Sequence, residues 1–163
     1  MKCIMFAAVA AVLIPIPAAA QALVTERTLS LDAAIQAAQT ALDTCRKNGH
    51  NVTVTVLNKA GRIKAQLHDD KAGPHTIENS FRKAYTSITF RGGIPSGEFG
   101  QSVAKTPPPH ALLLLQNVTT GEGALPIKAG NELVGSIGVS GAPGGDKDAV
   151  CAQAGIDRIK AGL

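Results

Sequence analysis

The stretch VTVTVLNKAGRIKAQLH, residues 52–68, decides the fold. Its first half alternates valine with threonine, and after the turn at 58–61 apolar residues alternate with Lys64 and Gln66. An alternation of period two on both sides of a glycine-containing turn predicts a hairpin of two antiparallel strands. The threonine and lysine positions imply that one face of the sheet is less deeply buried than the other.

Helical patterns lie on both sides of this hairpin. Ser30 can cap a helix that Gly49 is placed to end, and Thr76 can cap a second helix that stops at 91–93. The apolar face expected for the first helix comprises Leu31, Ile35, Ala38, Leu42 and Cys45. The apolar face expected for the second helix comprises Ile77, Phe81, Ala84, Tyr85 and Ile88.

The rest of the chain predicts one short helix, up to three strands and a final helix. The short helix is expected over about 96–104, and the prolines at 107–109 exclude regular structure after it. The apolar or alternating runs that follow are 110–116, 126–129 and 132–139, and the last helix opens at Asp146 or Asp148. Hairpin strands with helices grouped between them indicate an α+β domain, an antiparallel sheet covered by helices.

The first 22 residues have the order of a secretory signal peptide. Lys2 precedes an apolar run from Ile4 to Ile14, and small residues fill 18–22. The run is shorter than the roughly 20 residues that a membrane-spanning helix needs, so no membrane anchor is expected. Cleavage after Ala22, with a site after Ala20 as the alternative, would leave residues 23–163 as a single domain, located in the periplasm or secreted.

Charge and composition argue against nucleic-acid binding. The whole chain has a formal net charge of +4, but its basic residues are scattered rather than gathered in a stripe. Aromatic residues make up only 3% of the chain, too few to form a platform on which bases stack.

Two cysteines, Cys45 and Cys151, remain after the signal peptide. An oxidising compartment and an even cysteine count predict one disulfide, which would join the end of the first helix to the last helix. The alternative is a pair of buried free thiols.

The segment HDDKAGPHTIENSFRKAY, residues 68–85, holds most of the residues that could carry chemistry. His68, Asp70 and His75 are candidate metal ligands, although no HExxH motif or paired cysteine spacing fixes a ligand set. The alternative is that the two aspartates form a turn and His68 is an ordinary strand side chain.

The same segment offers a second interpretation, a site for an anionic ligand. His75 and Thr76 stand at a helix start, where free N–H groups attract anions, and Arg82 and Lys83 follow on the next turns. An imidazole for iron and basic groups for propionates are what haem requires. The alternative is that Thr76 only caps the helix while Arg82 and Lys83 are solvated.

No nucleophile or phosphate-loop motif supports a specific enzyme class. The chain has no G-x-S-x-G, and the glycines of 141–145 lack the Lys-Ser/Thr end of a phosphate loop, so this segment is interpreted as the turn into the last helix. An enzyme that uses His75 as a base, oriented by Asp70, stays open.

Five short motifs resemble one family across nearly the whole mature chain. They are VLNKAG (56–61), DDKAG (69–73), RKAYT (82–86), GALPI (123–127) and GSIGVSG (135–141). Together they make the chain similar to the GlcG/HbpS type of small haem-binding proteins. The resemblance implies a profilin- or PAS-like antiparallel sheet, assembly into homo-oligomers, and haem or iron binding outside the cytoplasm in some members.

With that resemblance, the leading hypothesis is a periplasmic or secreted oligomeric protein that binds haem or a related cofactor. Its ligand-binding residues would be His75, Thr76, Arg82, Lys83 and Tyr85. One alternative is an enzyme or accessory protein acting on a small hydroxy acid or aromatic metabolite. Another is a non-catalytic partner of a sensor or transporter.

Overall fold

The computed structural model describes residues 22–106, 112 and 114–163. All but the last residue of the predicted signal peptide lies outside this part, and so does the proline run at 107–109. The helices are α1 (Leu31–Lys47), α2 (His75–Thr89), α3 (Ser96–Lys105) and α5 (Gly145–Ile159), followed by the short 3-10 helix η1 (Lys160–Gly162). The strands are β1 (Thr53–Asn58), β2 (Ile63–His68), β3 (Ala124–Ala129) and β4 (Glu132–Ser140).

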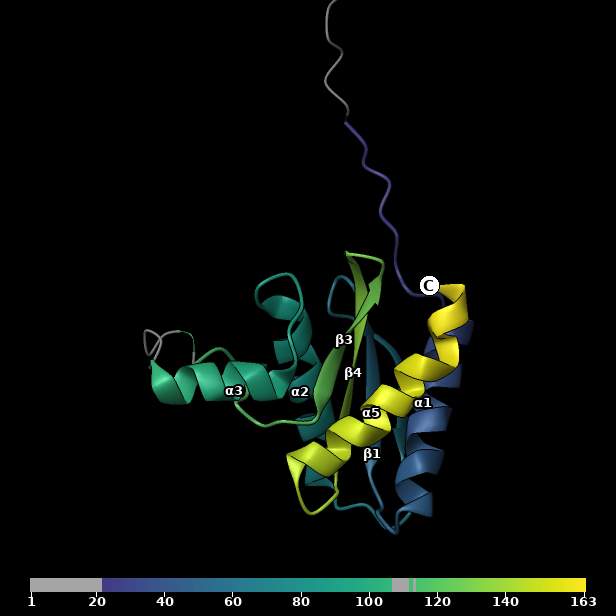
Figure 1. Cartoon of the computed structure of the whole chain (residues 1–163), viewed down its shortest axis with the longest axis vertical. Coiled ribbons are helices and arrows are strands. Elements are labelled where there is room, and N and C mark those ends of the chain that lie inside the picture. Colours follow the sequence, from purple (N-terminus) through teal and green to yellow (C-terminus); the bar gives the residue numbers. More distant parts are fainter. Residues whose placement is uncertain (1–21, 107–111, 113) are drawn as a thin grey trace, which may run out of the picture.

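The four strands form one antiparallel sheet in the order β2-β1-β4-β3. Helices α1 and α5 lie side by side on one face, and α2 packs on the other face against β1 and β4 (Figure 1). The predicted α+β class is therefore confirmed, as are the hairpin of β1 with β2 and the approximate positions of α3, β3 and β4.

The apolar run at 110–116 is not a strand where the structure describes it. Leu112 is helical, 114–116 are turns or bends, and the side chain of Leu114 is 82% exposed. The sheet takes its edge strands from β2 and β3 instead.

Helix α1 begins as predicted, because the Ser30 hydroxyl accepts a hydrogen bond from the Ala33 N–H at 3.2 Å. Its predicted buried face is wrong at the start: Leu31 and Ile35 are about half exposed. The other three predicted positions, Ala38, Leu42 and Cys45, are buried as expected. Together with Ala38, three further alanines at 34, 37 and 41 form a stripe of small residues, all 0% exposed, against α5 and the sheet.

Small residues are needed here because α1 and α5 approach closely. A Cβ added at Gly155 of α5 would lie 2.5 Å from the carbonyl oxygen of Ala37. No side chain larger than hydrogen fits at that contact, so the two helices pack backbone to backbone at this point.

The threonine face of β1 is also more buried than its polarity predicts. Thr53 and Thr55 are 0% exposed because α2 covers them. Thr53 Oγ1 lies 2.6 Å from Thr76 Oγ1, and Thr55 Oγ1 lies 2.7 Å from Ser80 Oγ. Hydroxyls that bond across the strand–helix interface satisfy each other, so a polar face can be buried without loss of hydrogen bonds.

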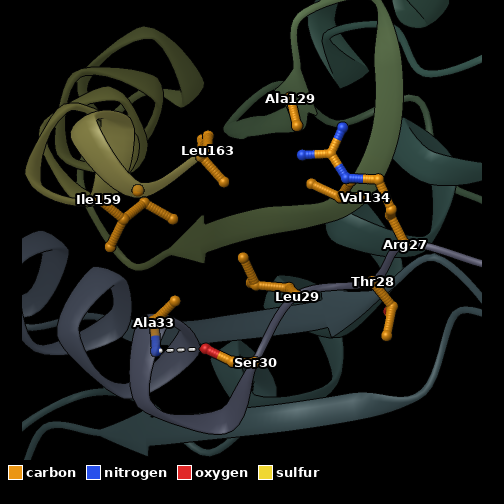
Figure 2. Close-up of a pocket in the computed structure, with 10 residues that line it drawn as sticks. Arg27, Thr28, Leu29, Ser30, Ala33, Ala129, Val134, Ile159 and Leu163 are labelled. Carbon is orange, nitrogen blue, oxygen red and sulfur yellow. Dashed lines mark hydrogen bonds between the residues drawn. The ribbon is translucent and has the colours of Figure 1, made fainter.

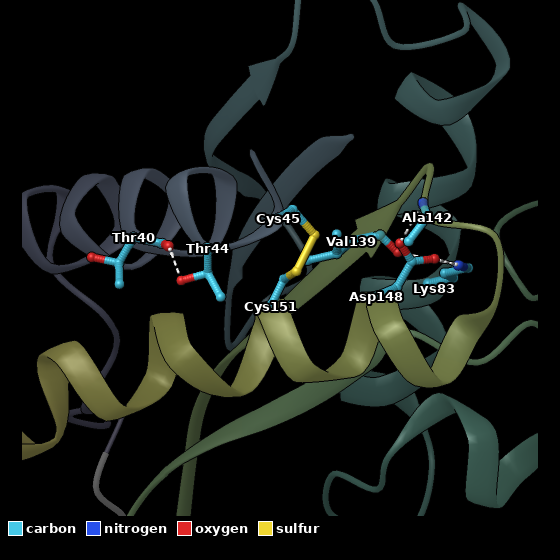
Figure 3. The surroundings of a disulfide bond; sticks show 8 residues. All are labelled: Thr40, Thr44, Cys45, Lys83, Val139, Ala142, Asp148 and Cys151. Atoms are coloured by element: carbon cyan, nitrogen blue, oxygen red, sulfur yellow. Dashed lines mark hydrogen bonds and ion pairs between the residues drawn. A yellow bond between two sulfur atoms is a disulfide. The ribbon is translucent and has the colours of Figure 1, made fainter. Parts of the chain in front are cut away.

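The predicted disulfide is present between Cys45 of α1 and Cys151 of α5, with a Cα–Cα distance of 5.5 Å (Figure 3). Both cysteines are fully buried in the main core between the two helices and the sheet. The bond joins residues 106 positions apart, so it fixes the first helix of the domain to the last.

In the described part of the chain, no helix combines the length and the apolar character needed to cross a bilayer.

Candidate functional site

Two adjoining hollows flank the start of α2, and they share His75 and Asn79. One, of about 240 Å³, is lined by His75, Glu78, Asn79 and Arg82. These residues follow the spacing i, i+3, i+4, i+7, which places them on one helix face. The other hollow, of about 350 Å³, extends to the glycine loop (residues 141–145) and the first turn of α5. We call the two hollows together the His75 groove.

His75, the first residue of α2, is exposed and its ring lies close to Gly73. A Cβ added at Gly73 would come within 2.8 Å of the ring atom Cε1, so glycine leaves the space that the imidazole occupies. Among the described residues, no side chain or backbone group forms a hydrogen bond with the ring. Its nitrogens are therefore available to a ligand.

Arg82 lies two turns along α2 in the same hollow. Its Nη2 donates to the carbonyl oxygen of Val118 at 2.9 Å, and its Nη1 lies 3.5 Å from Glu78 Oε1. Its Nε is buried and has no hydrogen-bond partner in the described part of the chain. A buried N–H without an acceptor costs free energy. The Arg82 side chain as a whole is 34% exposed, so a ligand carboxylate would meet the exposed part of its guanidinium.

Lys83 differs from Arg82 because its positive charge is already paired with a carboxylate inside the protein. It is 5% exposed, and its Nζ donates to Asp148 Oδ2 at 2.8 Å and to the Val139 carbonyl oxygen at 3.1 Å (Figure 3). Asp148, 2% exposed, also accepts from the Ala142 N–H at 3.0 Å. Burial raises the pKa of Asp148, and the hydrogen bond from Lys83 opposes that rise.

Thr76 and Tyr85 do not line the His75 groove. Thr76 is not the helix cap that the sequence predicts: α2 begins at His75, two residues before the expected start, and the buried Thr76 hydroxyl donates to the Gly73 carbonyl oxygen at 2.6 Å. Tyr85 is half-buried against Phe81 and the hairpin turn at Gly61. Their predicted ligand contacts stay predictions, but both side chains have structural partners.

His68, Asp70 and His75 do not come together as a metal-ligating cluster. No group of three histidine, cysteine or acidic side chains suited to a metal exists in the described residues. His68 Nδ1 lies 2.7 Å from Thr53 Oγ1. The Thr76 hydroxyl proton goes to Gly73, so Thr53 must donate to Thr76 and His68 must donate to Thr53. Only Nε2 of His68 is left as a possible ligand atom.

Sequence reasoning missed three contributors to the groove. Asn79 donates to Ser140 Oγ at 2.9 Å, Glu122 lines the larger hollow, and Asp148 pairs with Lys83. The one available signal is the composition of 141–148, in which three glycines, an alanine and a proline precede two aspartates, and which the sequence alone indicates only as the turn into the last helix.

The groove lies at the end of β4. A separate cavity of about 190 Å³, lined by both polar and apolar groups, lies near the start of that strand (Figure 2). Its wall includes Leu29, Val134 and Ile159, and Arg27 stands at its side. None of the residues proposed from the sequence lines it.

Comparison with known proteins identifies the family. The family model described as haem degrading protein HbpS-like matches residues 29–157. No curated protein matches the chain significantly.

Three solved structures have the same fold. The crystal structure of HbpS is 32% identical, covers 87% of this chain and 97% of its own, and has a TM-score of 0.77. Klebsiella pneumoniae protein ORFY is 21% identical, with coverages of 88% and 99% and a TM-score of 0.79. The haem complex of PduOC is 22% identical, with coverages of 81% and 95% and a TM-score of 0.73. On the family match and the similarity to HbpS, this chain belongs to the HbpS-like family.

Proposed function

We propose that this chain is a periplasmic or secreted haem-binding protein whose site is the His75 groove. The observation that carries the proposal is that a free imidazole and a guanidinium lie in one hollow. His75 presents an imidazole with free nitrogens, and Arg82 brings a partly exposed guanidinium to the same hollow. The family description and the haem complex of PduOC support haem as the ligand.

The two residues fit the two polar demands of haem. Positions 75 and 82 are seven residues apart, a rise of about 10 Å along the helix axis. That separation suits an imidazole at the iron and a guanidinium at a propionate on the porphyrin edge. Arg82 would hold the carboxylate through its guanidinium and orient the ring, and His75 would hold the iron. Bound haem would supply an iron centre able to bind small ligands and exchange electrons.

The groove on one chain would leave much of the porphyrin uncovered. Its smaller hollow is lined by four polar residues, His75, Glu78, Asn79 and Arg82. Haem has two large apolar faces whose burial favours binding. The proposal therefore includes a homo-oligomer, in which a second copy covers the porphyrin face that the groove leaves in water.

The test is a haem titration of residues 23–163, followed by absorbance. His75→Ala should abolish the saturable Soret shift, whereas the control His50→Ala should keep it, because His50 lies outside the groove. Arg82→Met should weaken binding about tenfold, the loss expected for one charge-assisted hydrogen bond. The exposed Arg62→Met is its control. An identical shift in His75→Ala and the unmodified chain would refute the site.

Two parts of the proposal have their own tests. Size-exclusion chromatography with light scattering should show an oligomer, and haem should increase its share. Expression of the full chain in a bacterium, followed by fractionation, should place the mature form outside the cytoplasm with a new N-terminus near residue 23. Full-length protein in the cytoplasm would refute the proposed location, and the proposal of a haem site would be unaffected.

A second candidate function is an enzyme acting on a small polar metabolite. The observation in its favour is the larger hollow, which is lined by His75, Asn79, Glu122 and glycines rather than by apolar side chains. His75 would act as the base, but no hydrogen bond between Asp70 and His75 is among those of the described residues. Turnover that His75→Ala removes while haem leaves it unchanged would favour this candidate.

A further inference from the structure

The buried ion pair between Lys83 and Asp148 connects three parts of the fold. Lys83 belongs to α2 and Asp148 to the first turn of α5. The Val139 carbonyl oxygen adds β4 through its bond to Lys83, and the Ala142 N–H adds the glycine loop through its bond to Asp148. The hydrogen bonds of Lys83 and Asp148 are therefore all made to groups inside the protein.

Stability alone gives a weak reason for such a pair. Taking two charges out of water costs free energy, and replacing a buried ion pair with apolar residues of similar size is often neutral or stabilising. The chain also makes special room for it: a Cβ at Gly123 would lie 2.7 Å from Asp148 Cβ and 2.9 Å from Lys83 Nζ. A role in fixing one geometry explains the pair better than a contribution to stability.

The geometry that the pair fixes is part of the wall of the larger hollow, which His75 also lines. The glycine loop, Lys83 and Asp148 all line this hollow together with His75. Helix α5 is uncapped at its start, since Gly144 provides no side-chain hydrogen bond. The Asp148 carboxylate is the group that holds the loop, and the disulfide at Cys151 holds the same helix one turn later (Figure 3).

We propose that Lys83 and Asp148 are a positioning pair, which sets the glycine loop against His75 and does not bind the ligand. The inference rests on the proposed function, because the groove is taken as the binding site. It also separates two adjacent basic residues: Arg82 contacts the ligand, and Lys83 acts through Asp148 and the loop.

Asp148→Asn distinguishes the two roles that Lys83 could have. If Lys83 bound a ligand carboxylate, the loss of its internal partner would free it, and haem affinity would stay or rise. For a positioning pair, the same change should lower affinity by about tenfold or more and speed hydrogen exchange of the 141–145 amides. Asp157→Asn, exposed on the same helix, is the control and should change neither.

A second variant covers the case in which Asp148→Asn does not fold. The apolar pair Lys83→Met with Asp148→Leu removes both charges together, so the fold should be retained. Its amides at 141–145 should still exchange faster, and its haem affinity should still be reduced, because Ala142 has lost its acceptor. Unmodified affinity with a protected loop in this variant would overturn the proposal.

Hydrogen exchange keeps this test independent of the ligand. If the unmodified chain binds no haem, the proposed function fails, yet loop exchange in the two variants still decides whether the pair holds the loop. If haem binds and the loop stays protected in both variants, only the positioning role fails.

Discussion

Thr53 on β1 and Thr76 on α2 share a hydrogen bond of 2.6 Å between fully buried hydroxyls. The bond is one link in a chain that runs from His68 through both threonines to the Gly73 carbonyl oxygen. A parallel chain runs from Gln66 through Thr55 and Ser80 to the Ile77 carbonyl oxygen. These two relays hold the first turns of α2, which carry His75 and Asn79, against the hairpin.

Thr53→Val should destabilise the protein although it conserves shape. The change removes the acceptor of the His68 ring N–H and leaves a Thr76 lone pair without a donor, which should cost about 1–3 kcal/mol of the free energy of unfolding. Urea unfolding followed by circular dichroism measures it, with the exposed Thr25→Val as control. Equal midpoints for the two variants would mean that water replaces the relay.

Gly155→Ala should also destabilise the protein, although alanine has a higher helix propensity than glycine. In an exposed helix this change gains about 1 kcal/mol. Here the new methyl group would meet the Ala37 carbonyl oxygen, and overpacking typically costs about 1–3 kcal/mol. Gly97→Ala in α3 is the control, because its methyl group would meet only the side chain of Glu122. A more stable Gly155→Ala would show that α1 and α5 can separate without cost.

Arg46→Gln should make the protein more sensitive to acid. The hydrogen bond from Arg46 Nε, 2.8 Å from Asp69 Oδ2, holds the pKa of Asp69 below its ordinary value of 3.8. Because the folded-state pKa is the lower one, ionised Asp69 favours folding above pH 3.8, and this contribution is lost as the pH falls through the folded pKa. Without Arg46, burial still raises the pKa of Asp69, and only the smaller effects of the Asp70 N–H and of His68 oppose that rise.

The midpoint of acid unfolding should therefore move to higher pH in Arg46→Gln. Circular dichroism between pH 6 and 2 measures it, and Arg158→Gln, exposed on α5, controls for the lost charge. A midpoint shared by all three proteins would exclude Asp69 as a contributor.

Removal of the disulfide should lower stability by about 2–5 kcal/mol, because the bond closes a long loop in the unfolded chain. The double variant Cys45→Ala with Cys151→Ala should unfold at lower urea concentration than the oxidised protein. The unmodified chain unfolded in urea with a reducing agent should behave similarly. If reduction leaves the midpoint unchanged, then the bridge does not form in solution.

Local patterns predicted what depends on neighbours in sequence. The alternation in 52–68 gave the hairpin, Ser30 gave the start of α1, and the cysteine count gave the bridge. Of the buried alanines only Ala38 was predicted, because Leu31 and Ile35 dominate the hydrophobic periodicity, whereas close helix packing selects small side chains. No local pattern in α1 indicates that its contact with Gly155 of α5 requires small side chains.

The candidate site was predicted only where one helix face carries it. His75 and Arg82 lie on α2, and their spacing alone places them together. Lys83 and Asp148 are 65 positions apart, so their pairing depends on how α5 returns to the sheet. Lys83 is buried because the tertiary fold places Asp148 beside it, and its charge alone does not predict this.

The bridge between Cys45 and Cys151 also changes what a protease can do to this molecule. A single cut of the backbone anywhere between these two residues leaves both pieces joined through sulfur. Such a nicked molecule would run as one band on a non-reducing gel and as two bands after reduction. A protease that cuts at the hairpin turn near Gly61 would break the continuity of the chain there, and α1 would stay beside α5.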